Sequence, residues 1–273
     1  MVDLTINTDV AREILTGFIK SEISRAGFSR AVVNLSGGLD SALSCALAVE
    51  ALGSKNVLAL RLPYRTSSPD SLEHAQLLID KFGIPSETIE ITGMVDPLIM
   101  RDPDISKIRK GNIMARMRMI VLYDKTEVYK GLPIGTSNKT EILLGYSTLW
   151  GDMASAINPI GDLYKTQVRQ LSRALGIPAP IIDKPPSADL WAGQTDEDEL
   201  GFTYEQVDQL LYLLVDQRYS PRECMEEGFD EKFVNLVITR IQRNQFKRMM
   251  PPIAKLSNRT IGYDFLYLRD WGT

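Results

Sequence analysis

The stretch of sequence that decides the fold is Ala31-Val32-Val33-Asn34-Leu35-Ser36-Gly37-Gly38-Leu39-Asp40-Ser41, and a run rich in Ala and Leu continues from it through Leu52. The apolar residues at its start predict a short buried strand, and the Ala- and Leu-rich run predicts a helix. Gly37 and Gly38 permit a tight turn with bare backbone N–H groups. A glycine-rich turn between a strand and a helix N-terminus forms a site for anions such as phosphate.

The rest of the chain alternates between helical and strand-like patterns. Apolar residues at helical spacing predict helices at 8–26, with Thr8 as N-cap, at 72–82, at 105–124 and after Asp162. Short apolar runs predict further strands at 57–62, 87–91 and 132–134. This alternation predicts an α/β fold, in which helices cover both faces of a parallel sheet and ligands bind beyond the carboxyl ends of the strands.

A long irregular segment is predicted before a helical C-terminal part. Residues 178–203 include four prolines and the acidic run Asp196-Glu197-Asp198-Glu199. A connection of this length without regular structure is typical of a functional lid or of a linker. By composition, we expect the acidic run to be a solvated loop.

The bulk composition excludes several classes of protein. The 273 residues are 44% hydrophobic and 24% charged, which is ordinary for a globular chain. The formal net charge of −4 and the absence of a basic stripe argue against a nucleic-acid partner. Two distant cysteines, Cys45 and Cys224, predict neither a disulfide framework nor a zinc site. Because no stretch reads as a membrane span or a signal peptide, we expect no membrane partner and a cytoplasmic location.

The glycine-rich loop differs from the two commonest nucleotide-binding motifs. No Lys follows the glycines, as a Walker A loop requires, and the three spaced glycines of a dinucleotide fingerprint are missing. The simplest interpretation is a turn in which Asp40 complements the helix dipole, worth about 0.3–1 kcal/mol. However, the six residues from Ser36 to Ser41 match the SGGxDS signature of ATP-pyrophosphatases, which cleave ATP between the α- and β-phosphates. This resemblance implies that ATP is bound by Asn34, Leu35, Ser36, Gly37, Gly38, Leu39, Asp40 and Ser41.

Four further motifs extend the resemblance over nearly the whole chain. They are Arg61-Leu62-Pro63-Tyr64, the GNxxARxRM motif at 111–119, Gly135-Thr136-Ser137-Asn138-Lys139-Thr140-Glu141, and the segment at 186–201. With them, the chain resembles the NAD synthetases. The resemblance implies a Rossmann-like fold of the adenine nucleotide alpha hydrolase kind with a helical C-terminal part. It also implies that residues 1–273 form a single synthetase domain of the PP-loop type, without an N-terminal glutaminase domain.

The same resemblance implies roles for individual residues. Asp40 and Glu141 would bind Mg²⁺, and the further contacts to ATP would come from Thr136, Lys165 and Ser187. Asp40, Lys165 and Asp152 would be catalytic, with Asp152 positioning ammonia. Deamido-NAD would be bound by Arg116, Phe246 and Lys247.

Three of these residues also have simpler interpretations. Asn138 and Glu141 have the spacing of a capping box, which needs no metal. Lys165 could be an ordinary surface lysine, and Arg116 could lie on a solvated helix face. The alternatives stay open from the sequence alone.

The chain departs from the family pattern after the Glu141 loop. Many ammonia-dependent relatives read TKYGDGxxD there, whereas Leu149 and Ala156 replace the dinucleotide-contacting Lys and Asp in this chain. The form of this segment is closer to the synthetase domain of glutamine-dependent enzymes. Since no amidase domain is expected, the ammonia would be free or would come from a separate ammonia-generating partner.

The implied reaction is the ATP-dependent amidation of deamido-NAD (nicotinic acid adenine dinucleotide) with ammonia. It would give NAD, AMP and pyrophosphate through an NAD-adenylate intermediate, in a homodimer. Amidation of nicotinate mononucleotide by the same chemistry is the nearest alternative. Two further alternatives are a PP-loop enzyme that acts on another substrate, such as tRNA, and a non-enzymatic nucleotide-binding module. A pyrophosphate-release assay separates the module from the enzymes.

Overall fold

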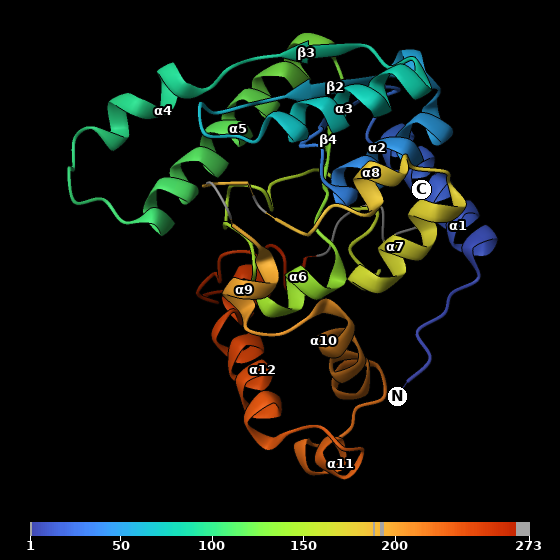
Figure 1. Cartoon of the computed structure of the whole chain (residues 1–273), viewed down its shortest axis with the longest axis vertical. Helices are drawn as coiled ribbons and strands as arrows, with labels where there is room; N and C mark the ends of the chain where they lie inside the picture. Colours follow the sequence, from blue (N-terminus) through green and yellow to red (C-terminus); the bar gives the residue numbers. More distant parts are fainter. Residues whose placement is uncertain (1, 188, 192–193, 266–273) are drawn as a thin grey trace.

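The sheet confirms the predicted parallel architecture. The computed structural model describes residues 2–187, 189–191 and 194–265. Within them, one sheet is formed by β1 (Ala31–Asn34), β2 (Val57–Arg61), β3 (Ser86–Thr88) and β4 (Leu132–Ile134). Every pairing is parallel, in the order β3-β2-β1-β4 (Figure 1). The carboxyl end of β1 therefore lies between those of β2 and β4.

Helices cover both faces of the sheet. Successive residues of a strand point to opposite faces, so neighbouring residues pack against different helices. Val33 and Ala59 face an apolar cluster shared with α1 (Thr8–Arg25), α2 (Leu39–Leu52), α3 (Pro69–Phe82) and α7 (Lys165–Ala174). Val32 and Leu60 face a second apolar cluster, shared with α4 (Thr92–Ile99) and α5 (Lys107–Tyr129). The predicted α/β fold is therefore confirmed.

Several boundaries differ from the predicted ones. The N-cap of α1 is Asn7 rather than Thr8, because the Asn7 side chain accepts a hydrogen bond from Val10 N at 3.1 Å. Helix α3 begins with Pro69, a residue favoured in the first turn of a helix. Strand β3 is shorter than predicted, and α5 is longer.

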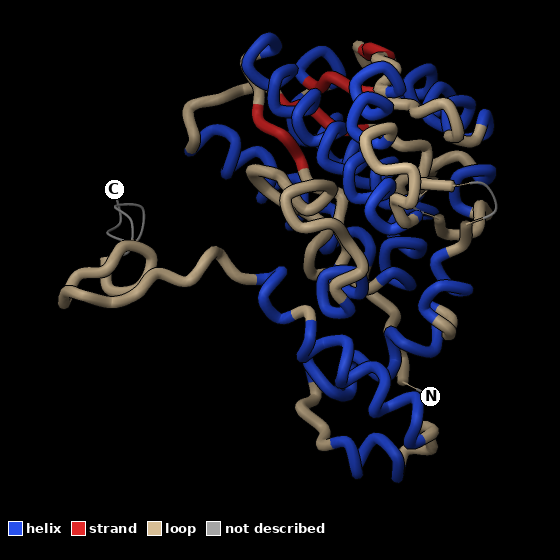
Figure 2. Tube along the Cα trace, turned by 90° about the vertical axis from the view of Figure 1, so that its left-hand side faces the viewer, coloured by secondary structure: helices blue, strands red, loops and turns tan. Residues whose placement is uncertain are grey.

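The helices of the C-terminal part have an apolar cluster of their own, which includes Leu144 and Tyr164. Figure 1 shows this part below the sheet. Its helices are α6 (Lys139–Leu144), α10 (Tyr204–Leu211), η2 (Tyr212–Asp216), α11 (Pro221–Glu226) and α12 (Glu231–Arg243). Short turns complete the set: η1 (Ser54–Asn56), α8 (Ala179–Ile182), α9 (Asp196–Leu200) and η3 (Gln245–Arg248). After η3 the chain projects from the body as an extended segment (Figure 2).

The segment at 178–203 contains two short helices, α8 and α9, where an irregular connection was predicted, and the expectation that its acidic run is a solvated loop was wrong for Asp196. Thr195 caps α9, so Asp196 lies in the first helical turn and points inward with 4% of its surface exposed. Its carboxylate accepts hydrogen bonds from the hydroxyls of Tyr146 and Tyr204, each at 3.1 Å. Tertiary contacts, which composition does not reveal, satisfy this charge.

Candidate functional site

The turn after β1 has the geometry of an anion-binding loop. Gly37 has a φ of +79°, and a Cβ at this position would lie 2.0 Å from Ser71 O, so only glycine fits. The Ser41 hydroxyl closes the loop, since it lies 3.0 Å from the Ser36 hydroxyl and accepts from Ser36 N at 3.2 Å. Gly38 has no side chain to cap α2, so the first N–H groups of this helix remain available to an anion.

Three predicted residues from three different helices meet beside this loop. The ammonium of Lys165, at the start of α7, forms ion pairs with Asp40 of α2 and, at 3.2 Å, with Glu141 of α6. The Lys165 side chain is only 4% exposed, and both carboxylates are less than one fifth exposed. The amide of Asn138 also donates to Asp40 Oδ1 at 2.8 Å. Lys165 is therefore a buried site residue and not a surface lysine.

The electrostatics of this cluster favour a bound cation. Burial raises the pKa of Glu141 to about 8, and the nearby charge of Asp40 adds to this rise, while Lys165 opposes it. Burial by itself would lower the pKa of Lys165, but the charges of Asp40 and Glu141 outweigh it and raise this pKa above its ordinary value. Lys165 thus stays protonated, whereas burial next to Asp40 disfavours the ionised form of Glu141, so a further positive charge beside this carboxylate would be stabilising.

Glu141 forms the capping box that the sequence offered as an alternative, and its carboxylate also lines the cavity. Asn138 Oδ1 accepts from Glu141 N at 2.9 Å, and Glu141 Oε2 accepts from Asn138 N at 3.5 Å, which forms the predicted capping box. Its other oxygen, Oε1, contacts Lys165. The capping box therefore orients the carboxylate toward the pocket and does not remove it from the site.

The chain after α8 covers the glycine-rich loop. Asp189, in a left-handed conformation with a φ of 51°, accepts hydrogen bonds from Ser68 N at 3.1 Å and from the Ser71 hydroxyl at 3.0 Å. Lys184 Nζ donates to the same Ser71 hydroxyl at 2.9 Å. Ser187 Oγ accepts from Asp189 N at 3.1 Å. These bonds fasten the segment to the first turn of α3.

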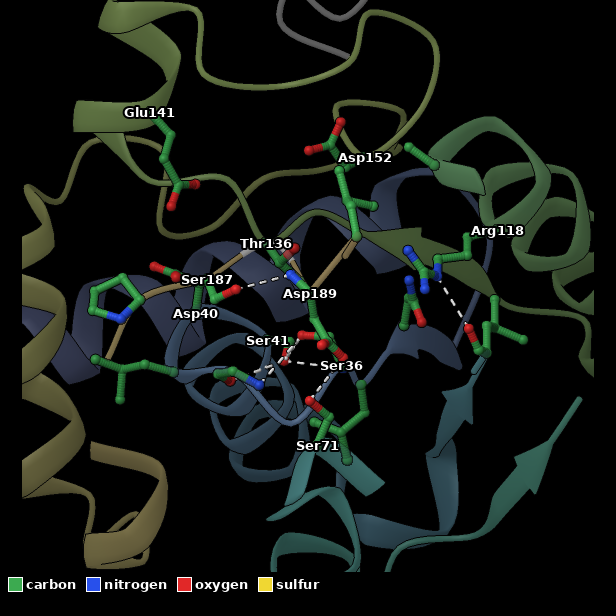
Figure 3. Close-up of a pocket in the computed structure, with 18 of the residues that line it drawn as sticks. Ser36, Asp40, Ser41, Ser71, Arg118, Thr136, Glu141, Asp152, Ser187 and Asp189 are labelled. Atoms are coloured by element: carbon green, nitrogen blue, oxygen red, sulfur yellow. Dashed lines mark hydrogen bonds between the residues drawn. The ribbon is translucent and has the colours of Figure 1, made fainter. Parts of the chain in front are cut away.

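One cavity of about 240 Å³ brings most of the predicted site residues together (Figure 3). Gly37 is buried beneath its wall. The predicted residues that line the cavity are Asn34, Leu35, Ser36, Gly38, Leu39, Asp40, Ser41, Thr136, Glu141, Asp152, Lys165 and Ser187. The cavity lies beyond the carboxyl ends of the strands, as expected for a sheet of this kind.

Asp152 also faces this cavity. Its Oδ1 accepts a hydrogen bond from Thr148 N at 2.6 Å. Surrounding protein raises the pKa of Asp152, and the Thr148 N–H and the positive charge of Lys247 partly oppose this rise. Because the residue is exposed to water in the cavity, solvent screens much of the effect.

The three predicted deamido-NAD contacts do not line the cavity. Arg116 is exposed and donates to Leu149 O at 3.1 and 3.3 Å. Lys247 Nζ donates to the carbonyls of Gly145 and Ser147 at 2.7 and 2.8 Å. Phe246 is 60% exposed. Arg116 and Lys247 thus brace the segment at 145–149 from outside, and their contact with a dinucleotide stays a prediction.

Sequence reasoning missed Arg118, which lines the same cavity. It lies four residues from both Met114 and Leu122, two buried residues of α5. This spacing puts Arg118 on the buried face of the helix, and an arginine on an apolar stripe is a signal that could have been read. Tyr146 and Asp196 also line the cavity and were not assigned to the site.

The glycine-rich loop and the charged cluster define an α/β protein with the geometry of an anion-binding site at the carboxyl end of β1, an inner strand of its sheet. Comparison with known proteins gives the family. The family described as NAD synthase matches residues 11–251, and the chain belongs to this family.

Relatives agree with this assignment over the full length. The chain is 56% identical to the NH(3)-dependent NAD(+) synthetase of Trichlorobacter lovleyi, with 100% of both chains covered. Among solved structures, the NMN synthetase from Francisella tularensis is 31% identical with a TM-score of 0.82. The NH3-dependent NAD synthetase from Campylobacter jejuni is 33% identical with a TM-score of 0.79. Each structural comparison covers 92% of this chain and 100% of the other.

Proposed function

We propose that this chain is an ammonia-dependent NAD synthetase, a ligase that converts deamido-NAD, ATP and ammonia to NAD, AMP and pyrophosphate. The observation that carries the proposal is the Lys165 ammonium held between Asp40 and Glu141 beside an open glycine-rich loop. This arrangement provides positive charge and backbone N–H groups for a polyphosphate. The family and the full-length relatives support the same reaction.

The chemistry explains why ATP is needed. A carboxylate is a poor acyl donor, because amide formation would have to expel oxide. In the first step a carboxylate oxygen of deamido-NAD attacks the α-phosphorus of ATP, and the bond to the bridging oxygen breaks to release pyrophosphate. In the second step ammonia attacks the carbonyl carbon of the adenylate, AMP leaves with the bonding electron pair, and the nitrogen loses a proton to solvent.

Positioning and charge stabilisation suffice for both steps, and good positioning can supply about 7–11 kcal/mol. The loop N–H groups and Lys165 stabilise the charge that grows on the leaving pyrophosphate. Asp152, at the cavity wall, attracts ammonium and positions ammonia after loss of its proton. The segment at 184–189 covers the loop and excludes water, which would otherwise hydrolyse the adenylate.

Asp40 and Glu141 fit a magnesium ion. Both carboxylates contact one ammonium, so a cation between them would find two hard oxygen ligands. Mg²⁺ is usually held by one or two carboxylates together with substrate phosphates. The described residues contain no group of three or more His, Cys, Asp or Glu side chains that could hold a metal ion. When bound, Mg²⁺ would neutralise charge on the phosphates.

A second candidate substrate is nicotinate mononucleotide. Leu149 and Ala156 offer no polar side chain where the family pattern has Lys and Asp, and the backbone of each is already bonded, to Arg116 and to Pro133 O. The structural similarity to an NMN synthetase favours this candidate. The mechanism would be unchanged.

We further propose a homodimer in the cytoplasm. Helices α4 and α5 and the loop that joins them expose several apolar side chains, which a second copy of the chain would cover: Leu98, Met100, Ile108, Ile120 and Val128.

Among the described residues, no helix is both long and apolar enough to cross a membrane.

The test is product analysis with ATP, Mg²⁺, ammonium and either deamido-NAD or nicotinate mononucleotide. We expect NAD and AMP in a one-to-one ratio from the dinucleotide, and loss of both products in Asp40→Ala. If only the mononucleotide is amidated, nicotinate mononucleotide is the substrate and deamido-NAD is not. If neither compound is amidated and no pyrophosphate appears, the proposal is wrong.

A further inference from the structure

Arg118 places a guanidinium group in the wall of the cavity, and some of its N–H groups make no hydrogen bond to the described residues. Its Nε donates to Leu62 O at 3.0 Å, and its Nη2 lies 3.5 Å from the Ser67 hydroxyl (Figure 3). Its Nη1 makes no hydrogen bond to the part of the chain that the structure describes. The two bonds hold the planar group in a fixed orientation and leave one edge of it unused.

The charge of Arg118 is not paired. Within residues 2–187, 189–191 and 194–265, no carboxylate lies within 4.0 Å of the guanidinium, whereas Arg109 on the same helix pairs with Asp102. Burial lowers the pKa of Arg118, while Asp189 and Asp152 oppose this from a longer range. Because a guanidinium keeps its proton, the result is a poorly solvated positive charge without a partner. Such a charge is costly unless an anion compensates it.

The position of Arg118 indicates which anion this is. Figure 3 shows Arg118 on the opposite side of Ser36 and Ser41 from Asp40 and Glu141. The Lys165 end of the cavity suits the leaving pyrophosphate. The other end must then receive what stays behind, which is the α-phosphate joined to adenosine and the carboxylate that attacks it.

We propose that Arg118 binds an oxyanion at the reacting centre, namely the α-phosphate of ATP or the pyridine carboxylate. The inference rests on the proposed function, since only that reaction brings both anions to this cavity. A guanidinium edge suits either group, because its parallel N–H bonds match two oxygens. During the first step the carboxylate oxygen becomes part of the anhydride, and the α-phosphate keeps one negative charge. Arg118 would stabilise this charge until the second step, in which AMP leaves with one further negative charge on its phosphate.

Binding measurements without turnover test the proposal. We would determine dissociation constants for AMP and adenosine, which differ by one phosphate, and for deamido-NAD and NAD, which differ in carboxylate against amide. In the wild type the anionic member of at least one pair should bind more tightly. In Arg118→Gln we expect that advantage to fall by about 10- to 100-fold, the range for a hydrogen bond to a charged group. The pair that loses its advantage identifies the anion.

Two variants control for folding and for general charge effects. Arg109→Gln removes the same type of side chain from the same helix, where it pairs with Asp102 at the surface, and it should bind all four compounds like the wild type. Arg118→Lys keeps the charge without the planar edge and should recover part of the loss. If Arg118→Gln does not fold, both advantages are measured in Arg118→Met, which also lacks the charge but keeps an apolar side chain.

Retention of both advantages within threefold in a folded variant that lacks the charge, Arg118→Gln or Arg118→Met, would overturn the proposal. So would a wild type that binds AMP no better than adenosine and deamido-NAD no better than NAD. Because the readout is binding, it stays separate from the proposed function. A protein that binds these anions through Arg118 but makes no NAD would contradict the reaction alone.

Discussion

The carboxylate of Asp208 accepts a hydrogen bond from the Thr140 hydroxyl at 2.5 Å, and neither residue is exposed to solvent. The same hydroxyl accepts from Lys165 N at 3.0 Å, and the other oxygen of Asp208 accepts from Thr166 N at 2.8 Å. Helix α10 thereby joins the first turns of α6 and α7, next to Glu141 and Lys165. The C-terminal helices therefore hold the charged cluster in place.

Asp208→Asn is expected to weaken this junction. The amide nitrogen of the new side chain would face either Thr166 N, which is a donor, or the Thr140 hydroxyl, whose proton would then lose its acceptor, so one buried donor loses its partner in either orientation. The free energy of unfolding should fall by about 1–3 kcal/mol. Denaturant titration of the magnesium- and nucleotide-free protein measures this.

A matched control is Asp216→Asn, because Asp216 bonds Lys139 and Tyr164, the residues just before Thr140 and Lys165. Asp216 is 32% exposed, so water can replace its partners, and we expect a smaller loss. Equal losses in the two variants would contradict the role given to the buried carboxylate.

Glu141 should make the stability of the ligand-free protein depend on pH. Its pKa rises from about 4.5 in the unfolded chain to about 8 in the folded protein, so folding favours its protonated form. Its contribution to stability is complete below pH 4.5 and is lost as the pH rises through 8. Between pH 5 and 8 the wild type should therefore lose stability relative to Glu141→Gln, by an amount on the order of a few kcal/mol.

Chemical denaturation of both proteins at several pH values measures this difference. Mg²⁺ with ATP should reduce it, because the cation favours the ionised carboxylate. A difference that stays constant from pH 5 to 8 would show that Glu141 is ionised throughout.

Gly37→Ala should prevent the loop from closing. The new methyl group would lie 2.0 Å from Ser71 O, and backbone atoms of α3 cannot move aside without shifting the helix. Gly53→Ala is the control, because Gly53 has a similar φ of +84° with no atom within 4 Å of the added group. It should cost only backbone strain, on the order of 1–3 kcal/mol, because a φ of +84° with a ψ of 145° is a conformation that residues other than glycine rarely adopt.

Calorimetric titration with ATP and thermal unfolding distinguish the two variants. We expect Gly37→Ala to lose ATP binding and Gly53→Ala to keep it. Normal ATP affinity in Gly37→Ala would show that the loop is not the phosphate site.

Lys165→Met should slow pyrophosphate release by about 100-fold or more, a loss typical of removing a group that stabilises transition-state charge. Lys139→Met is the control, because Lys139 begins α6 as Lys165 begins α7, but pairs with Asp162 and Asp216. A continuous pyrophosphate assay at saturating substrates compares the two. Equal rates of pyrophosphate release in Lys165→Met and Lys139→Met would show that Lys165 has no specific role in the reaction.

Several features could be predicted because they depend on neighbouring residues. The apolar run at 31–35, the glycines and the Ala- and Leu-rich run predicted β1, the loop and α2, since turn geometry and helix propensity are local. Likewise, the spacing of Asn138 and Glu141 predicted the capping box. Within the acidic run only the burial of Asp196 was not predicted, because Tyr146 and Tyr204, which donate hydrogen bonds to its carboxylate, come from other segments.

The sequence by itself determined the order of strands and helices, the anion-binding loop and the residue types of the site, because backbone conformation and short-range capping act over a few residues. Only the tertiary structure decided which charges meet. Lys165 pairs with Asp40 across 125 residues of sequence, and Asp208 supports that pair from a helix further along. It also decided that Arg118 faces the cavity with no carboxylate partner among the described residues, while Arg116 lies outside. Burial and packing set these environments, and no local pattern encodes them.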